Sequence, residues 1–413
     1  MTDPFPADAR LAKADIAVDI GIIGAGPVGG ALACRLAAEG VRVAIVDRAA
    51  LPPMEHPDFD GRAYAVAAGA QALLAAAGLW QRLPYPAGPI RDIRVSDGRV
   101  GRPASPLHLH FSARDAGSDA FGWMVEARSL RMAINRRMPE LASLSVFAPA
   151  DAAVSRAGAG AEIRIAGGPT IACRLVVAAE GRRSPLREAA KIPVTRLDYK
   201  QTGMVFAIAH ERPHHGIALE HFLPAGPFAQ LPMAGTAGAE HLSAIVWTER
   251  TATAAHLMAL PAERFEREAA RRLGDHLGGI KLLGRRWSYP LTAMHAHRYT
   301  DTRLALAGDA AHGVHPIAGQ GLNLGFLDVA ELSRLIIAAV QAGDDPGGSE
   351  LLRRYQAARR PANLAMLAAT DSLDRLFSTD SRVIRAARDL GIAAVHRMPA
   401  LKRLFIRQAM GAA

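Results

Sequence analysis

The sequence has few cysteines and aromatic residues, and it lacks a long run of strongly apolar side chains. Two cysteines in 413 residues, Cys34 and Cys173, cannot form the disulfide framework typical of small secreted proteins. Their separation also matches no zinc-binding pattern. The N-terminus is polar and acidic, whereas a signal peptide begins with basic and then apolar residues. These absences predict a cytoplasmic protein.

One stretch, residues 63–80, carries no charge and is as long as a marginal membrane span. Most of it is alanine and glycine, which favour membrane insertion only weakly, and Gln71 and Gly78 interrupt it. We therefore interpret this stretch as a buried loop and helix.

Basic residues exceed acidic ones, 49 to 39, and the excess of ten is unevenly distributed. Residues 351–413 contain 12 basic and four acidic side chains, so this segment carries +8 and the remaining chain +2. A net positive charge can indicate a nucleic-acid partner, but few aromatic residues accompany these charges and no nucleic-acid-binding motif is present. We therefore predict no nucleic-acid partner.

Residues 373–413 combine the basic charge with apolar residues at helical spacing, as in Leu401, Leu404 and Phe405. A basic amphipathic helix of this kind is typical of segments that lie on an anionic membrane surface. The alternative is a C-terminal helix that docks on the body and exposes its basic face to water.

The first motif is a glycine-rich loop between an apolar strand at 19–23 and a helical stretch at 30–39. The loop reads Gly24-Ala25-Gly26-Pro27-Val28-Gly29, and a second apolar strand at 41–46 ends at Asp47. Gly24 allows a tight turn, Gly26 lets the backbone approach a pyrophosphate, and Gly29 lets the helix pack closely on the strand. The helix N-terminus favours phosphates, and Asp47 can accept hydrogen bonds from ribose hydroxyls. The motif predicts a site for FAD or NAD.

A second motif lies at residues 303–323, far along the chain. A short apolar strand at 304–307 is closed by Gly308 and Asp309, and Gly319 and Gly321 flank the start of a long helix. Asp309 can hold a sugar or ribityl hydroxyl. The amides of residues 321–323 (Gly321, Leu322 and Asn323) would stabilise negative charge, which a reduced flavin acquires at one edge of its ring. The alternative is a buried, capped helix.

This string resembles the second FAD motif of the single-component (class A) flavin aromatic hydroxylases, the para-hydroxybenzoate hydroxylase group. Residues 315–325, His-Pro-Ile-Ala-Gly-Gln-Gly-Leu-Asn-Leu-Gly, further resemble the signature of the ubiquinone-biosynthesis hydroxylases. Residues 60–62, 226–229 and 245–248 agree with that subgroup. The resemblance implies FAD as cofactor, NADH or NADPH as transient reductant, O2 as co-substrate and a polyprenyl phenol as substrate.

The resemblance also implies roles for individual residues. Asp309 would bind the ribityl chain, Pro316 and residues 321–323 would line the flavin ring and shape the reacting centre, Arg62 would contact the pyrophosphate, and Arg128 would lie near the flavin. Glu180 follows a third apolar strand where the family usually has aspartate, and it is a further cofactor-binding candidate. Arg187, in the loop after it, is a candidate for a functional role. For these charged residues the alternative is a solvated surface charge. No side chain is singled out as a catalytic acid or base.

The sequence has no second strand–glycine loop–helix unit, so we expect nicotinamide to bind transiently. Three histidine pairs, at 108 and 110, 214 and 215, and 312 and 315, have no third ligand at a recognisable spacing, so we predict no metal site.

The dispersed motifs predict an α/β fold with a discontinuous, Rossmann-like FAD-binding domain at 17–90, 128–188 and 290–372. An antiparallel β-sheet substrate domain at 91–127 and 189–289, C-terminal helices and a basic helical tail at 373–413 complete the prediction. Four aromatic residues could line a pocket between the two domains or could be core residues: Phe206, Phe222, Phe228 and Trp247.

These features predict an FAD-dependent, NAD(P)H-consuming monooxygenase that hydroxylates the ring of a polyprenyl phenol in ubiquinone biosynthesis. We expect it in the cytoplasm, peripherally attached to the inner membrane, with other ubiquinone-biosynthesis proteins as candidate partners. The alternatives are a flavin hydroxylase of another small aromatic compound and a non-catalytic FAD-binding subunit of a biosynthetic complex, which the unusual Glu180 leaves open.

Overall fold

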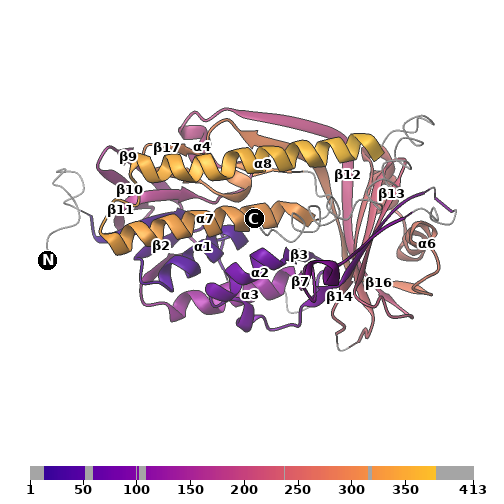
Figure 1. Cartoon of the computed structure of the whole chain (residues 1–413). Coiled ribbons are helices and arrows are strands. Elements are labelled where there is room, and N and C mark those ends of the chain that lie inside the picture. The colour runs from indigo at the N-terminus through magenta and orange to yellow at the C-terminus, as the bar shows by residue number, and fades with distance from the viewer. Residues whose placement is uncertain are drawn as a thin grey trace.

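A computed structural model describes residues 14–51, 59–98, 100–101, 108–236, 238–314 and 319–377. Two eight-stranded sheets and one three-stranded sheet form its framework, and helices cover the first large sheet (Figure 1). The mixed α/β architecture predicted from the sequence is confirmed.

The first sheet is mainly parallel and is built from strands dispersed along the chain. Its order is β17 (Thr300–Asp301), β18 (Leu304–Leu306), β11 (Thr170–Ala178), β1 (Ile16–Ile23), β2 (Val43–Val46) and β8 (Leu144–Phe147), and β10 (Gly160–Ile165) and β9 (Ala152–Ala157) extend it antiparallel from β11. Helices flank the sheet, so β2 is buried along its whole length. Strands far apart in sequence thus share one Rossmann-like sheet.

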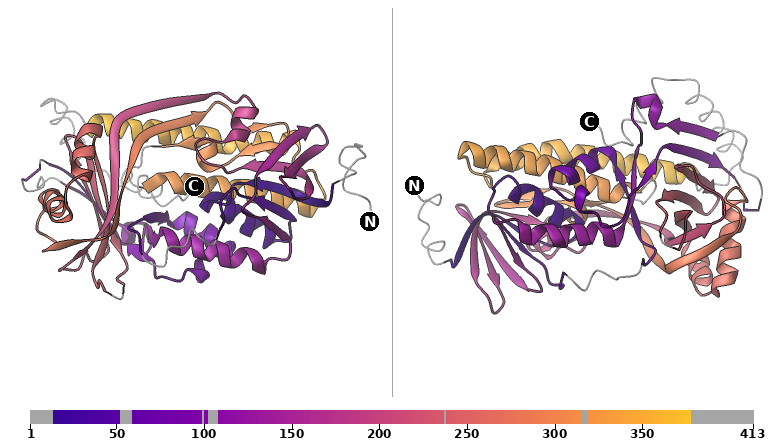
Figure 2. Two further views of the ribbon diagram at one scale, coloured as in Figure 1. Left: turned by 180° about the vertical axis from the view of Figure 1, so that it is seen from behind. Right: turned by 90° about the horizontal axis from the view of Figure 1, so that it is seen from below.

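The second sheet is antiparallel except where β13 pairs with β5 in parallel. Its order is β19 (His312–Gly313), β16 (Ile280–Ala296), β12 (Val194–His210), β15 (Leu242–Arg250), β14 (Gly226–Met233), β13 (Ile217–Leu223), β5 (Asp92–Asp97) and β6 (His108–Ser112). The long strands β12 and β16 extend towards the first sheet (Figure 2), and β16 crosses the domain boundary expected near residue 290.

The two faces of the second sheet pack against different parts of the molecule. One face lies under α5 (Thr251–Met258) and α6 (Ala262–Leu273), where the rings of Phe206 and Phe265 are 4.9 Å apart. Phe228 and Trp247 belong to the same core. The hypothesis that these aromatic residues line the pocket is therefore wrong for Phe206, Phe228 and Trp247. The opposite face packs on the small sheet of β3 (Ala63–Ala67), β7 (Gly122–Glu126) and β4 (Gly88–Ile90).

Two long helices, α7 (Gln320–Ala342) and α8 (Ser349–Phe377), lie side by side along the molecule (Figure 1). The other helices are α1 (Pro27–Ala37), α2 (Ala68–Ala76), α3 (Ala127–Arg137), α4 (Pro185–Ala189) and the short 3-10 turns at 80–82, 113–116, 138–140 and 308–310. The uncharged stretch at 63–80 contains the expected helix, α2, but the strand β3 stands where a loop was expected. None of the helices in the described ranges is long and apolar enough to cross a membrane.

The predicted basic tail begins in the last turn of α8, which ends at Phe377. The rest of the tail, and with it the predicted membrane-binding helix, lies outside the described residues.

Candidate active site

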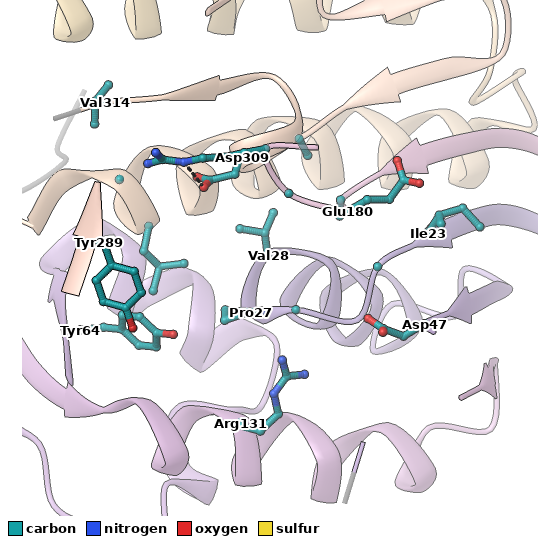
Figure 3. Close-up of a pocket in the computed structure, with 18 of the residues that line it drawn as sticks. Ile23, Pro27, Val28, Asp47, Tyr64, Arg131, Glu180, Tyr289, Asp309 and Val314 are labelled. Carbon is teal, nitrogen blue, oxygen red and sulfur yellow. Dashed lines mark hydrogen bonds and ion pairs between the residues drawn. The ribbon is translucent and has the colours of Figure 1, made fainter. Parts of the chain in front are cut away.

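A cavity of about 910 Å³ lies between the first sheet, the start of α7 and the second sheet (Figure 3). Both sequence motifs contribute to its lining. The predicted residues that line it are Gly24, Gly26, Pro27, Val28, Asp47, Glu180, Asp309, Gly319, Gly321 and Leu322. The fold therefore brings residues from three distant parts of the sequence around one cavity.

The glycines of the first motif have three different structural roles. Gly24 has a φ of +103°, and a Cβ there would lie 2.5 Å from the carbonyl oxygen of Ala179. A Cβ on Gly29 would lie 1.9 Å from the carbonyl oxygen of Gly24, so α1 can pack on this loop only without a side chain. A Cβ on Gly26 would meet nothing within 4 Å and would occupy the cavity. Gly26 thus leaves room for a ligand at the N-terminus of α1.

Asp47 lines the cavity but also holds the glycine loop. One carboxylate oxygen accepts a hydrogen bond from the Ala25 amide at 2.6 Å, and the other accepts one from the Ala49 amide at 2.8 Å. The acid at the end of β2 therefore fixes the loop that follows β1. Its expected contact with a ribose remains a prediction.

Asp309 lies at the end of β18 in an ion pair with Arg182, whose Nε donates to the carboxylate at 3.0 Å. Arg182 also donates to the Thr292 hydroxyl at 3.1 Å, and all three side chains line the cavity. Gly308 does not line it. A Cβ on Gly308 would lie 3.0 Å from Val28, so this glycine lets the loop approach α1.

The start of α7 faces the cavity through Gly321 and Leu322. Gly319 caps the helix with a φ of +64°, and a Cβ on Gly321 would meet nothing within 4 Å. Asn323 is buried instead: its side-chain oxygen accepts from the Ala67 amide and its nitrogen donates to the Ala65 carbonyl, both at 2.9 Å. Asn323 therefore positions the helix start against β3, and Pro316 lies outside the described residues.

A fully buried carboxylate, Asp328 of α7, lies behind the second motif. It accepts hydrogen bonds from the Gly308 amide at 3.0 Å, Arg359 at 2.9 Å and Asn363 at 3.0 Å, and His312 Nε2 lies 2.5 Å from it. Burial alone would raise the pKa of Asp328, but His312 and Arg359 more than offset this, and the pKa lies below its ordinary value. The network joins α7 and α8 to the loop that carries Asp309.

Glu180 lies at the cavity where the resemblance would place an aspartate. Its carboxylate accepts hydrogen bonds from the Ser184 hydroxyl and, at 3.4 Å, from the Leu186 amide. Burial raises the pKa of Glu180, and these hydrogen bonds act against the rise. Arg187 is buried and donates to the carbonyls of Ala310 and Arg182, so it braces the Asp309 loop from behind.

The two arginines expected at the cofactor do not line the cavity. Arg62 pairs with Asp60 at 2.6 Å, and Arg128 pairs with Glu126 at 2.6 Å. Arg131, one helical turn beyond Arg128 on α3, points into the cavity instead (Figure 3) and donates to the carbonyl of Ala25. The spacing of three residues places Arg128 and Arg131 on neighbouring helix positions, but the sequence alone did not single out the second.

The described residues contain no group of three histidine, cysteine or acidic side chains arranged to hold a metal ion. The cavity instead has the size and polar groups for a dinucleotide with an attached ring system. Two helix N-termini, at Gly26 and Gly321, offer hydrogen-bond donors, and acids at three strand ends offer acceptors. This fold and site define a flavin-binding protein of the Rossmann class.

The chain belongs to the family described as FAD binding domain, whose model matches residues 17–370. It is 50% identical over 400 residues to the ubiquinone hydroxylase UbiL of Rhodospirillum rubrum, covering 97% of this chain and 91% of the relative. It is 30% identical to the 3-demethoxyubiquinol 3-hydroxylase of Escherichia coli, covering 95% of this chain and 98% of the relative.

Solved structures show the same fold at lower identity. PqsL, a probable FAD-dependent monooxygenase from Pseudomonas aeruginosa, is 23% identical with a TM-score of 0.73, over 92% of this chain and all of the other. The p-nitrophenol 4-monooxygenase PnpA of Pseudomonas putida is 18% identical with a TM-score of 0.74, over 96% of this chain and 98% of the other. The predicted resemblance to the ubiquinone-biosynthesis hydroxylases, the FAD cofactor and the monooxygenase class are confirmed.

Gly26→Ala should weaken FAD binding about tenfold to a hundredfold, because the methyl group enters the cavity at the pyrophosphate end and overpacking costs about 1–3 kcal/mol. Stability of the apoprotein should change by no more than about 1 kcal/mol. Fluorescence titration of apoprotein with FAD measures the first quantity and urea unfolding the second. Gly158→Ala, in an exposed turn where a Cβ also meets nothing, is the matched control. Unchanged FAD affinity in Gly26→Ala would contradict the placement.

Asp328→Asn should lower the free energy of unfolding by about 3 kcal/mol, because it leaves Arg359 and His312 without their buried carboxylate. Glu331→Gln, which breaks only a surface ion pair on the same helix, should cost less than about 0.5 kcal/mol. Urea denaturation of both variants measures the difference. Equal, small effects would show that the Asp328 network does not anchor α7.

Proposed function

We propose that this protein hydroxylates the aromatic ring of a polyprenyl phenol in ubiquinone biosynthesis, with NADH or NADPH as the transient reductant and O2 as co-substrate. The observation that carries the proposal is the similarity, over nearly the whole chain, to a ubiquinone hydroxylase at 50% identity. The two-sided cavity supports it. Its first side carries both glycine motifs, and its second side is an apolar sheet face.

The apolar side suits a ring with a hydrocarbon chain. It includes Val205 of β12, Leu231 of β14 and Val246 of β15, which project from neighbouring strands of the second sheet. Such a surface binds an isoprenoid phenol by removing apolar area from water. Tyr64 of β3 and Tyr289 of β16 also line the cavity, with their rings close together (Figure 3), and they add ring edges and hydroxyl groups.

We assign the cofactor-facing side to FAD residue by residue. Gly26 and the N-terminus of α1 would hold the pyrophosphate, with Arg131 as the nearby cation, and Asp47 would hold the ribose. Asp309 would hold the ribityl chain, and the amides of Gly321 and Leu322 would stabilise negative charge on the ring. Bound FAD supplies the reactivity towards O2. The protein orients the substrate ring and keeps water out.

We also propose that the protein works at the membrane surface. Its substrate class is membrane-soluble, and residues 351–413 carry +8 in a chain whose remainder carries +2. Basic residues near an anionic surface each contribute about 1 kcal/mol to attraction. The peripheral inner-membrane location is part of this proposal.

The function is tested with purified protein, FAD, NAD(P)H, a prenylated phenol and 18O2. One labelled oxygen atom should appear on the ring, and the phenol should accelerate NAD(P)H oxidation. The same phenol without its prenyl chain is the control. It should be turned over more slowly, because it has no hydrocarbon chain to bury against the protein. NAD(P)H oxidation without a labelled product, for every prenylated phenol offered, would contradict the proposal.

Removal of residues 378–413 should reduce binding to vesicles that contain anionic lipid, while binding to neutral vesicles stays low for both proteins. Co-sedimentation with vesicles measures the binding of both proteins, and retained FAD shows that the shortened protein is folded. Raising the salt concentration should weaken binding of the full chain, since exposed charges are screened. Equal binding of the two proteins would contradict a membrane role of the tail.

A further inference from the structure

Among the residues that the structure describes, one carboxyl group of the second sheet has no hydrogen-bond or ion-pair partner. Glu220 lies in the middle of β13, and because side chains alternate along a strand it shares its face with Ala218 and Phe222. Ala218 belongs to the core between the second sheet and the small sheet, whereas Leu223 belongs to the core beneath α6. Glu220 therefore projects from the face that is turned towards the small sheet and the cavity.

The strand register relates Glu220 to the apolar side of the cavity. Glu220 is opposite Ala229 of β14, Ala229 is opposite Val246 of β15, and Val246 is opposite Val205 of β12. Val246 and Val205 line the cavity. Adjacent strands are about 4.8 Å apart, so the backbone of Glu220 lies about 10 Å from that of Val246, on the same face. Glu220 itself is not among the residues that line the cavity, but Leu231, its diagonal neighbour on β14, is one of them. The carboxyl group thus lies on the same sheet face, next to the edge of the cavity.

The residues around Glu220 give no structural reason for a carboxyl group at this position. Its nearest neighbours on that face are apolar: Ala218, Phe222, Ala229 and, on β5, Val95. Within the described ranges the carboxyl group forms no hydrogen bond or ion pair, and it remains partly accessible. Burial raises its pKa to about 7. A leucine would fit these neighbours better, so the glutamate costs stability where it is.

A destabilising polar group that borders a ligand site, on the same sheet face as the residues that line it, is the pattern expected of a group that binds the ligand. We propose that Glu220 is a substrate-binding residue whose carboxylate accepts a hydrogen bond from a hydroxyl group on the substrate ring. This inference rests on the proposed function, because it takes the phenol as the ligand. The apolar neighbours strengthen the hydrogen bond by excluding water, and the bond fixes which ring carbon faces the flavin side of the cavity.

The test compares a prenylated phenol that has one hydroxyl group with its methyl ether. Binding of each to the FAD-loaded protein is followed by the change in flavin absorbance. Wild-type protein should bind the phenol about tenfold or more tightly than the ether, because the ether cannot donate a hydrogen bond to a carboxylate. Glu220→Leu should bind the two compounds with equal affinity. The preference of Glu220→Gln for the phenol should lie between those of the wild type and Glu220→Leu.

Two further measurements separate binding from structure. Glu220→Leu should retain full FAD content and should unfold at the same or a higher urea concentration than wild type, since it removes an unpaired carboxyl group from apolar surroundings. Glu263→Leu, an exposed glutamate on α6 behind the same sheet, is the matched control and should keep the wild-type preference for the phenol.

A Glu220→Leu protein that keeps the preference for the phenol would overturn the inference while the proposed function stands. So would a large loss of stability in that variant, since it would indicate a structural role. If wild-type protein binds FAD but responds to no prenylated phenol, the proposed function fails, and the assignment of Glu220 fails with it.

Discussion

The site depends on one buried interaction, the carboxylate of Asp328 with its four partners. Arg359 and Asn363 come from α8, His312 from β19 within the second motif, and the Gly308 amide from the loop after β18. Because a buried carboxylate without partners is costly, these elements are held in one arrangement. That arrangement sets the position of Asp309 and, through α7, of Gly321 at the cavity.

The same constraint explains how a dispersed sequence forms one cavity. Arg187 braces the Asp309 loop from behind, Asn323 fixes the start of α7 on β3, and Asp47 holds the glycine loop. These bonds fix the polar side of the cavity, and the second sheet contributes the apolar side. Along its strands, side chains point alternately into the cavity and into the separate core under α6. The cavity thus combines a rigid cofactor side with a side suited to an isoprenoid ring.

Local patterns in the sequence were enough to predict the glycine loop, the acids at the ends of strands and the glycine-rich start of α7, since each pattern states its own backbone requirement. They could not predict contacts made through the fold. Arg131 lines the cavity and the predicted Arg128 does not, and three aromatic residues on the second sheet belong to the core because the strand alternation places them under α6. Glu220 gave no local signal, because its position depends on the register of four strands.

The central claim, hydroxylation of a ubiquinone precursor, is tested most directly by mass spectrometry of the prenylated quinones in cells of the source organism that lack this protein. The account predicts that a precursor short of one ring hydroxyl accumulates, that ubiquinone falls, and that the wild-type chain restores both. Normal ubiquinone without an accumulated precursor would contradict it.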